Sequence, residues 1–199
     1  MTELDAVNDL LATVGEFPVD SVSNPNPLVG SARRILAQTL TREQSRGWWF
    51  NRRKLTLEAG TNLTYPLRVE LPATVLSVDP YWRHKDYVQR GTFLYDRTEG
   101  TYDIGESVEC DVIEELTIDQ LPASAAAYFV SLACVRFSKA YDGDASKLRS
   151  LETEVQLARV PFHAEHVRNS DVNLYESGST GRALMLAYGH RYHVYGQYR

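Results

Sequence analysis

The sequence predicts an α+β protein: a helical bundle from N- and C-terminal helices, with an inserted small antiparallel β-domain and an extended C-terminal tail. Apolar residues recur at helical spacing up to about residue 50, alternate with polar ones over 51–117, and return to helical spacing afterwards. A composition of 43% hydrophobic and 24% charged residues is typical of a folded chain. The predicted segments are 1–50 (N-terminal helices), 51–117 (β-rich domain), 118–177 (helical hairpin completing the bundle) and 178–199 (flexible or docking tail).

Two helices are predicted in the N-terminal segment. Thr2 is a candidate N-cap for the first, and Gly15 supplies a left-handed stop. After a proline-rich stretch, Asn26 and Pro27 begin the second helix as cap and first-turn residue. We expect that helix to run for about 20 residues and to end at Gly47.

The middle segment has the period of strands. Residues 54–58 alternate polar and apolar side chains, as a half-buried strand does. Further strands are predicted at 64–69, 73–78, 86–89, 92–95 and 107–116. Turn signals at Thr61-Asn62, Arg90-Gly91 and Glu99-Gly100 favour a small antiparallel sheet or a barrel-like sandwich.

A helical hairpin is predicted after Pro122. Its first helix, 123–141, is rich in alanine and expected to be buried on most sides, and Asp144 caps a long second helix from 145 towards 172. Pro161 is expected to kink or interrupt that helix. The predicted inner stripe is Leu148, Leu151, Val155 and Leu157.

The charge is distributed unevenly. The net charge is −5, and residues 101–155 carry 11 acidic side chains against 4 basic ones, which argues against a protein that grips nucleic acid over its whole surface. The segment after the Gly/Ser-rich linker at 177–181 is rich in tyrosine and arginine, which are enriched in protein interfaces. We therefore expect it to dock on a partner through Tyr188, Tyr192, Tyr195 and Tyr198.

No strong catalytic or cofactor motif is present, so we expect no catalytic residue, no metal and no cofactor. His163 and His166 have the spacing of two metal ligands, but a zinc site needs a third. Cys110 and Cys134 are interpreted as small buried hydrophobes. The adjacent carboxylates at 114 and 115 would point to opposite faces of a strand and share no substrate.

A block of mixed basic and aromatic residues covers 42–54. Arginines with aromatic platforms can hold single-stranded nucleic acid. The favoured interpretation is instead that the tryptophans anchor the junction between helix and sheet, while the arginines form ion pairs within or between subunits. The interface candidates in this half of the chain are Arg33, Arg34, Arg46, Trp48, Trp49 and Arg52.

Three stretches resemble the tail tubular protein A family of short-tailed, podovirus-type phages. They are 6–19 (AVNDLLATVGEFPV), 32–36 (ARRIL) with 44–51 (QSRGWWFN), and 95–98 (YDRT). The resemblance implies a virion structural protein, an adaptor or gatekeeper that forms a twelve-fold ring between the portal protein and the tail nozzle (tubular protein B). It also implies attachment of tail fibres nearby, synthesis in the host bacterial cytoplasm and no membrane. The alternative left open is a virion-associated hydrolase of polysaccharide or cell wall.

The resemblance also implies that the ring lines part of the channel through which DNA is ejected, without specific DNA binding. Carboxylates facing such a channel would repel phosphates and let the DNA slide. The lumen candidates are Glu106, Glu109, Asp111 and Glu114.

Overall fold

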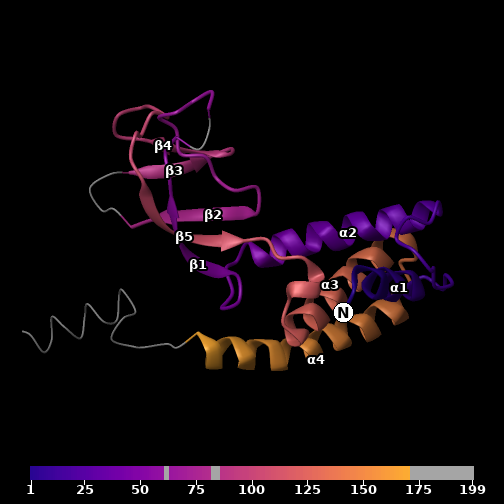
Figure 1. Cartoon of the computed structure of the whole chain (residues 1–199). Coiled ribbons are helices and arrows are strands. Elements are labelled where there is room, and N and C mark those ends of the chain that lie inside the picture. Colours follow the sequence, from indigo (N-terminus) through magenta and orange to yellow (C-terminus); the bar gives the residue numbers. More distant parts are fainter. Residues whose placement is uncertain (61–62, 82–85, 171–199) are drawn as a thin grey trace, which may run out of the picture. The chain divides into compact units, whose positions relative to one another are not determined.

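The computed structural model describes residues 1–60, 63–81 and 86–170, which are shown in colour in Figure 1. The chain divides into two units, 1–162 and 163–199, and the first holds all the described elements except the end of the last helix, which reaches Asn169. Helices and small antiparallel sheets confirm the predicted α+β class. Among the described helices, none combines the length and the apolar character that crossing a bilayer requires.

The two N-terminal helices begin at the predicted caps. In α1 (Glu3–Thr13), the Thr2 hydroxyl accepts from the backbone N–H of Asp5, whose carboxylate accepts from the Thr2 N–H. In α2 (Pro27–Gln44), Asn26 Oδ1 accepts from the N–H of Leu28 at 2.9 Å. Both helices therefore start where side chains satisfy backbone donors that have no partner within the helix.

A three-stranded antiparallel sheet has the order β1–β5–β2, with β1 at Arg52–Leu57, β5 at Val108–Glu114 and β2 at Val75–Pro80. A separate hairpin pairs β3 (Tyr87–Arg90) with β4 (Phe93–Asp96). Its two-residue loop starts at Gly91, whose φ of 63° gives the left-handed backbone that the predicted turn requires.

The strand predicted at 64–69 is wrong. This stretch forms only isolated bridges, between Arg68 and Asp103 and between Val69 and Ala59. Pro66 has no backbone N–H to donate and so interrupts any regular ladder there. The turn predicted at 61–62 lies outside the described residues.

Two separate hydrophobic clusters form the cores. One is helical, and its fully buried members include Leu10, Val29, Phe129 and Phe137 from α1, α2 and α3 (Ala123–Tyr141). The other lies in the β-rich part, around Val69, Leu94, Val108 and Val112. Because each cluster is closed in itself, polar contacts at the junction must fix the helices to the sheet.

Helix α4 (Ala145–Asn169) begins as predicted and departs from the prediction at two points. Asp144 Oδ1 accepts from the N–H groups of Ser146 (2.7 Å) and Lys147 (3.0 Å). The helix runs through Pro161 as one element, so of the predicted kink or interruption the interruption is wrong. Pro161 has no backbone N–H, so the carbonyl of Leu157, four residues earlier, lacks its helical partner. Leu157 lies on the solvent side of the helix, where water can bond to this carbonyl.

The predicted inner stripe of α4 is also wrong at Leu157, whose side chain is 69% exposed. The positions that pack on the helical core follow a 4–3–4 spacing, which keeps them on one face of a helix. They are Leu151, Val155, Ala158 and Phe162. Leu157 lies between two of these positions in the sequence but on another face of the helix, and it is exposed.

Two buried amides join the end of α2 to the end of β5. Gln44 Nε2 donates to the carbonyl of Leu116 (2.9 Å), and Gln44 Oε1 accepts from the same residue's N–H (2.8 Å). Asn51 Nδ2 donates to the carbonyls of Gln44 (3.0 Å) and Glu114 (2.9 Å), while Asn51 Oδ1 accepts from the N–H of Trp48 (2.7 Å). Gln44 on α2 therefore satisfies both backbone groups of Leu116, and Asn51 satisfies backbone groups on both sides of the junction.

Replacing Asn51 by Ala should destabilise the protein by about 2–3 kcal/mol, because buried backbone groups lose their partners. Asn24→Ala is the matched control: its exposed amide accepts only from the N–H of Asn26, and its loss should cost about 0.5 kcal/mol or less. Urea unfolding of both variants measures the difference. Equal midpoints for the two would show that the junction does not depend on Asn51.

Candidate functional site

The arginines proposed for interfaces differ in how far they are engaged within the chain. Arg33 Nε donates to Glu3 at 2.8 Å, with both side chains about half exposed. Arg46 lies 3.1 Å from the carboxylate of Glu43, which is itself buried. Arg34 and Arg52 are exposed, and no ion pair is recorded for either among the described residues. These two have the charge most available to a partner.

The two tryptophans lie between the end of α2 and the start of β1; Trp48 is buried and Trp49 is half-buried. Trp48 is 6% exposed, and its indole N–H donates to the carbonyl of Glu43 at 2.7 Å. Its ring meets Phe162 edge-on at 4.6 Å between centroids, and Trp49 packs against Phe162 (5.5 Å) and Phe50 (4.9 Å). Both rings therefore pack within the helical core, next to the residues that lead into β1.

The acidic residues of β5 do not share one environment. Burial alternates along the strand, so that Glu109 and Asp111 lie on its exposed side while Val108, Cys110 and Val112 face the core. Glu106, just before the strand, accepts from the hydroxyl of Tyr87 at 2.9 Å. Of the four lumen candidates, only Glu109 and Asp111 therefore share a solvent-facing surface.

A third carboxylate joins them from the neighbouring strand. Asp79 on β2 lies directly opposite Asp111, an arrangement in which like charges repel. The Asp111 carboxylate accepts a hydrogen bond from Tyr81, and this bond together with the surrounding negative charge raises the pKa of Tyr81 to about 12. We call Asp79, Glu109 and Asp111 the acidic sheet face.

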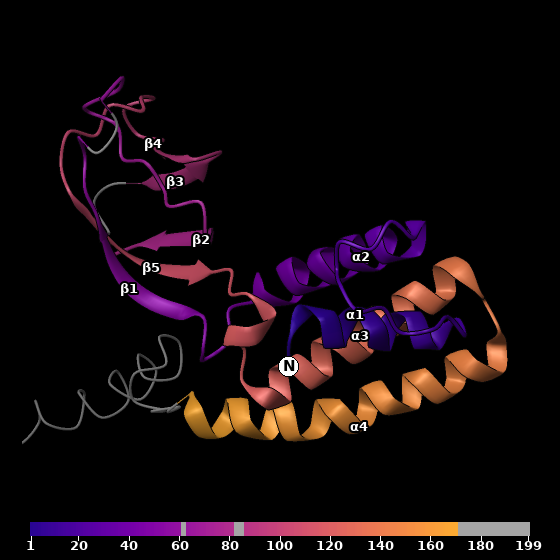
Figure 2. The same cartoon turned by 45° about the vertical axis from the view of Figure 1, so that its right-hand side comes forward.

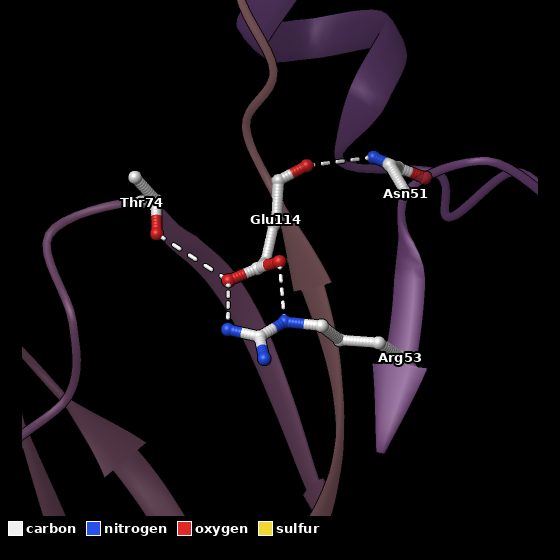
Figure 3. A network of polar contacts seen from close by, with 4 residues as sticks. All are labelled: Asn51, Arg53, Thr74 and Glu114. Atoms are coloured by element: carbon white, nitrogen blue, oxygen red, sulfur yellow. Dashed lines mark hydrogen bonds and ion pairs between the residues drawn. The ribbon is translucent and has the colours of Figure 1, made fainter. Parts of the chain in front are cut away.

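Glu114 belongs instead to a closed network, shown in Figure 3. Arg53 donates to its carboxylate from Nε (2.6 Å) and Nη2 (2.8 Å), and the Thr74 hydroxyl approaches at 3.5 Å. The bidentate guanidinium favours the charged carboxylate and holds the pKa of Glu114 below its ordinary value. Its charge is thus compensated on β1, which makes it a poor source of repulsion towards DNA.

An arginine cluster that the sequence analysis missed lies in the β-rich part. The Arg68 guanidinium lies over the ring of Tyr65 at 3.9 Å and also faces Tyr102 (5.2 Å) and Phe93 (5.7 Å). Its Nε lies 3.5 Å from a carboxylate oxygen of Asp103. The members of this cluster come from separate loops and one strand, so no regular spacing in the sequence predicts that they lie together.

A largely apolar groove of about 480 Å³ lies beside α2 and was also missed. We call it the α2 groove; its apolar lining includes Leu36, Ala37, Leu40 and Leu116. Glu3, Glu115 and Asp119 supply carboxylates to the lining, and Arg33 pairs with the first of these. A hydrogen bond from the Thr117 side chain lowers the pKa of Asp119.

The residues considered for chemistry have structural roles where the structure describes them. Cys110 and Cys134 are buried free thiols, and burial raises their pKa values to about 11 and about 12, which keeps both protonated. The adjacent carboxylates have different partners: Glu115 accepts a hydrogen bond from the hydroxyl of Thr41 on α2, and Glu114 accepts from Arg53 on β1. Within the described ranges no three potential ligands gather as a metal site would require. The four tyrosines predicted to dock, at 188–198, lie outside the described residues.

Replacing Glu114 by Gln should reduce stability by about 0.5–1 kcal/mol at neutral pH, a modest loss because Arg53 is half exposed. A lowered pKa adds stability above the group's ordinary pKa, and this is lost as the pH falls through the lowered value. The difference between wild type and Glu114→Gln should therefore shrink from pH 7 to pH 3, measured by denaturant unfolding. Glu58→Gln, at an exposed position, is the control, and a difference constant across this range would rule out the pair's contribution.

Comparisons with known proteins identify the family of this chain. The family model described as "Tail tubular protein" matches residues 4–172, which includes both cores. The chain is also 27% identical to "Tail tubular protein A" of Klebsiella phage KP34 over 169 residues, covering 85% of this chain and 89% of that protein. By the extent of the family match, the chain belongs to the tail tubular protein family and is a structural protein of a phage tail.

Proposed function

We propose that this chain is the adaptor of the tail: a ring-forming connector that joins the portal to the nozzle, lines part of the DNA channel and helps to attach tail fibres. The observation that carries the proposal is the family match, which runs from α1 through the sheet to the end of α4. The proposal assigns no catalytic activity to the chain, and the hydrolase alternative gains no support from the comparisons.

A ring of identical subunits requires two different faces on each copy, so that each copy contacts its neighbours head to tail. Twelve copies are proposed on the resemblance alone. Arg34 and Arg52 are the proposed charged contacts, since both are exposed. Segment 178–199 is proposed, from its composition, to dock on the portal or the nozzle.

The acidic sheet face is proposed to face the DNA channel. Three carboxylates share this exposed surface, those of Asp79, Glu109 and Asp111. The neighbouring cation, Lys54, lies over the ring of Tyr81, with its Nζ 5.3 Å from the ring centroid. Negative charge lining a channel repels DNA phosphates and so prevents tight binding during passage.

Mixed with portal protein, the purified chain should form a complex that contains many copies of it. Native mass spectrometry and electron microscopy, with the chain alone as the reference, measure this.

The chain truncated after residue 177 should keep its fold and bind the portal or nozzle more weakly. A full-length chain that stays monomeric and binds neither portal nor nozzle would refute the adaptor proposal.

Reversing two charges of the acidic sheet face, with Glu109→Lys and Asp111→Lys, should slow DNA ejection from assembled particles, because the surface would then attract phosphates. Glu16→Lys and Asp20→Lys in the exposed loop after α1 form the control pair. Ejection is followed by dye binding to released DNA. Kinetics like those of the control pair would remove the acidic sheet face from the channel.

A further inference from the structure

Helix α4 carries a solvent-facing apolar stripe opposite the residues that pack on the core. Leu157 is 69% and Val160 is 70% exposed, and Pro161 beside them is exposed too. The turns before them continue the same face with Arg149, Thr153 and Gln156, all exposed. We call these six residues the α4 stripe. Adjacent large apolar side chains on a surface mark an interaction site more often than scattered single ones.

Arg149 is the one charged residue of the α4 stripe. Within the part of the chain that the structure describes it has no recorded ion pair. The nearby Glu152 accepts from Lys139 at 2.9 Å and belongs to the contact with α3. A partner for the α4 stripe should therefore be apolar at its centre with negative charge at its edge.

The α2 groove has this complementary composition. Ala37, Ala73 and Leu116 supply its accessible apolar surface. Glu115 and Asp119 add two carboxylates with no recorded cationic partner among the described residues. The hydrogen bonds that these carboxylates accept come from the uncharged side chains of Thr41 and Thr117. Their negative charge is thus left uncompensated within one copy.

Helix α2, which lines the groove, and the first turns of α4, which carries the stripe, lie on opposite sides of the helical bundle (Figure 1 and Figure 2). In both Figure 1 and Figure 2, α1 and α3 lie between α2 and the first turns of α4. One copy therefore cannot bring its own stripe to its own groove. Two different, complementary and opposite faces are what a head-to-tail contact between identical chains requires.

We propose that the α4 stripe of one copy lies in the α2 groove of the next copy, with Leu157 and Val160 against Ala37 and Leu116 and with Arg149 near Asp119. The inference rests on the proposed ring and names the contact that builds it. Burial of the apolar residues supplies attraction, and the opposite charges fix which way round the copies meet.

Crosslinking in assembled particles tests the contact directly. Particles carrying Ala37→Cys together with Leu157→Cys, treated with a short bismaleimide, should give a ladder of dimers and larger multimers of this chain on a denaturing gel. Each single variant, and the wild type with its two buried cysteines, should give monomers. Dimers from Leu157→Cys alone would show that two stripes meet each other and would overturn the head-to-tail contact.

The remaining outcomes separate this inference from the proposed function. Particles that hold many copies of the chain in the tail yet give no ladder would overturn the contact and leave the adaptor proposal standing. Particles without the chain in the tail would overturn both.

Charge exchange tests the proposed orientation of the copies. Arg149→Asp or Asp119→Arg alone should reduce assembly of the purified chain by about fivefold or more, and the two together should restore it. Circular dichroism checks that each variant is folded, as expected for exposed positions. If the double variant assembles no better than the single variants, Arg149 and Asp119 do not contact each other between copies.

Discussion

The hydrogen bonds of Gln44 and Asn51 hold the helical layer and the sheet together. The helices and the strands each close a hydrophobic cluster of their own, so apolar packing alone does not fix one to the other. The two amides satisfy backbone groups on both sides of the junction, from Trp48 on one side to Leu116 on the other. A buried amide gains most when all its donors and acceptors are satisfied, and it resists displacement because any shift leaves one unpaired. Moving the helical layer away from the sheet at this junction would therefore leave buried donors and acceptors unpaired.

The aromatic group beside that junction explains how α4 is attached. Phe162 packs on Trp48 and Trp49 and, with Val155, is one of only two buried residues in the described α4. A long helix secured along one narrow face leaves most of its surface to water or to a partner. This is the physical reason that the α4 stripe is open, and it connects the stability of one copy with the proposed assembly of many.

Charge follows the same division between internal and external roles. Glu114 and Glu3 are paired with arginines inside the chain, whereas the acidic sheet face places like charges opposite one another. Pairing of the first kind adds to stability, but an arrangement of the second kind costs stability in the isolated chain. Repulsion of that kind is compatible with a surface whose task is to keep a polyanion moving.

Local sequence signals determined most of the elements. The caps at Thr2, Asn26 and Asp144, the hairpin at Gly91 and the return of helical spacing after Pro122 depend on a few neighbouring residues, and all are confirmed. The family resemblance found in short motifs is confirmed as well. Tertiary structure decided which face of α4 packs inward, and hence the outward position of Leu157, as well as the partner of Glu114 and the assembly of the Arg68 cluster. In each of these cases the deciding contact joins segments that are distant in sequence. The spacing of residues along the chain does not predict which distant segments come into contact.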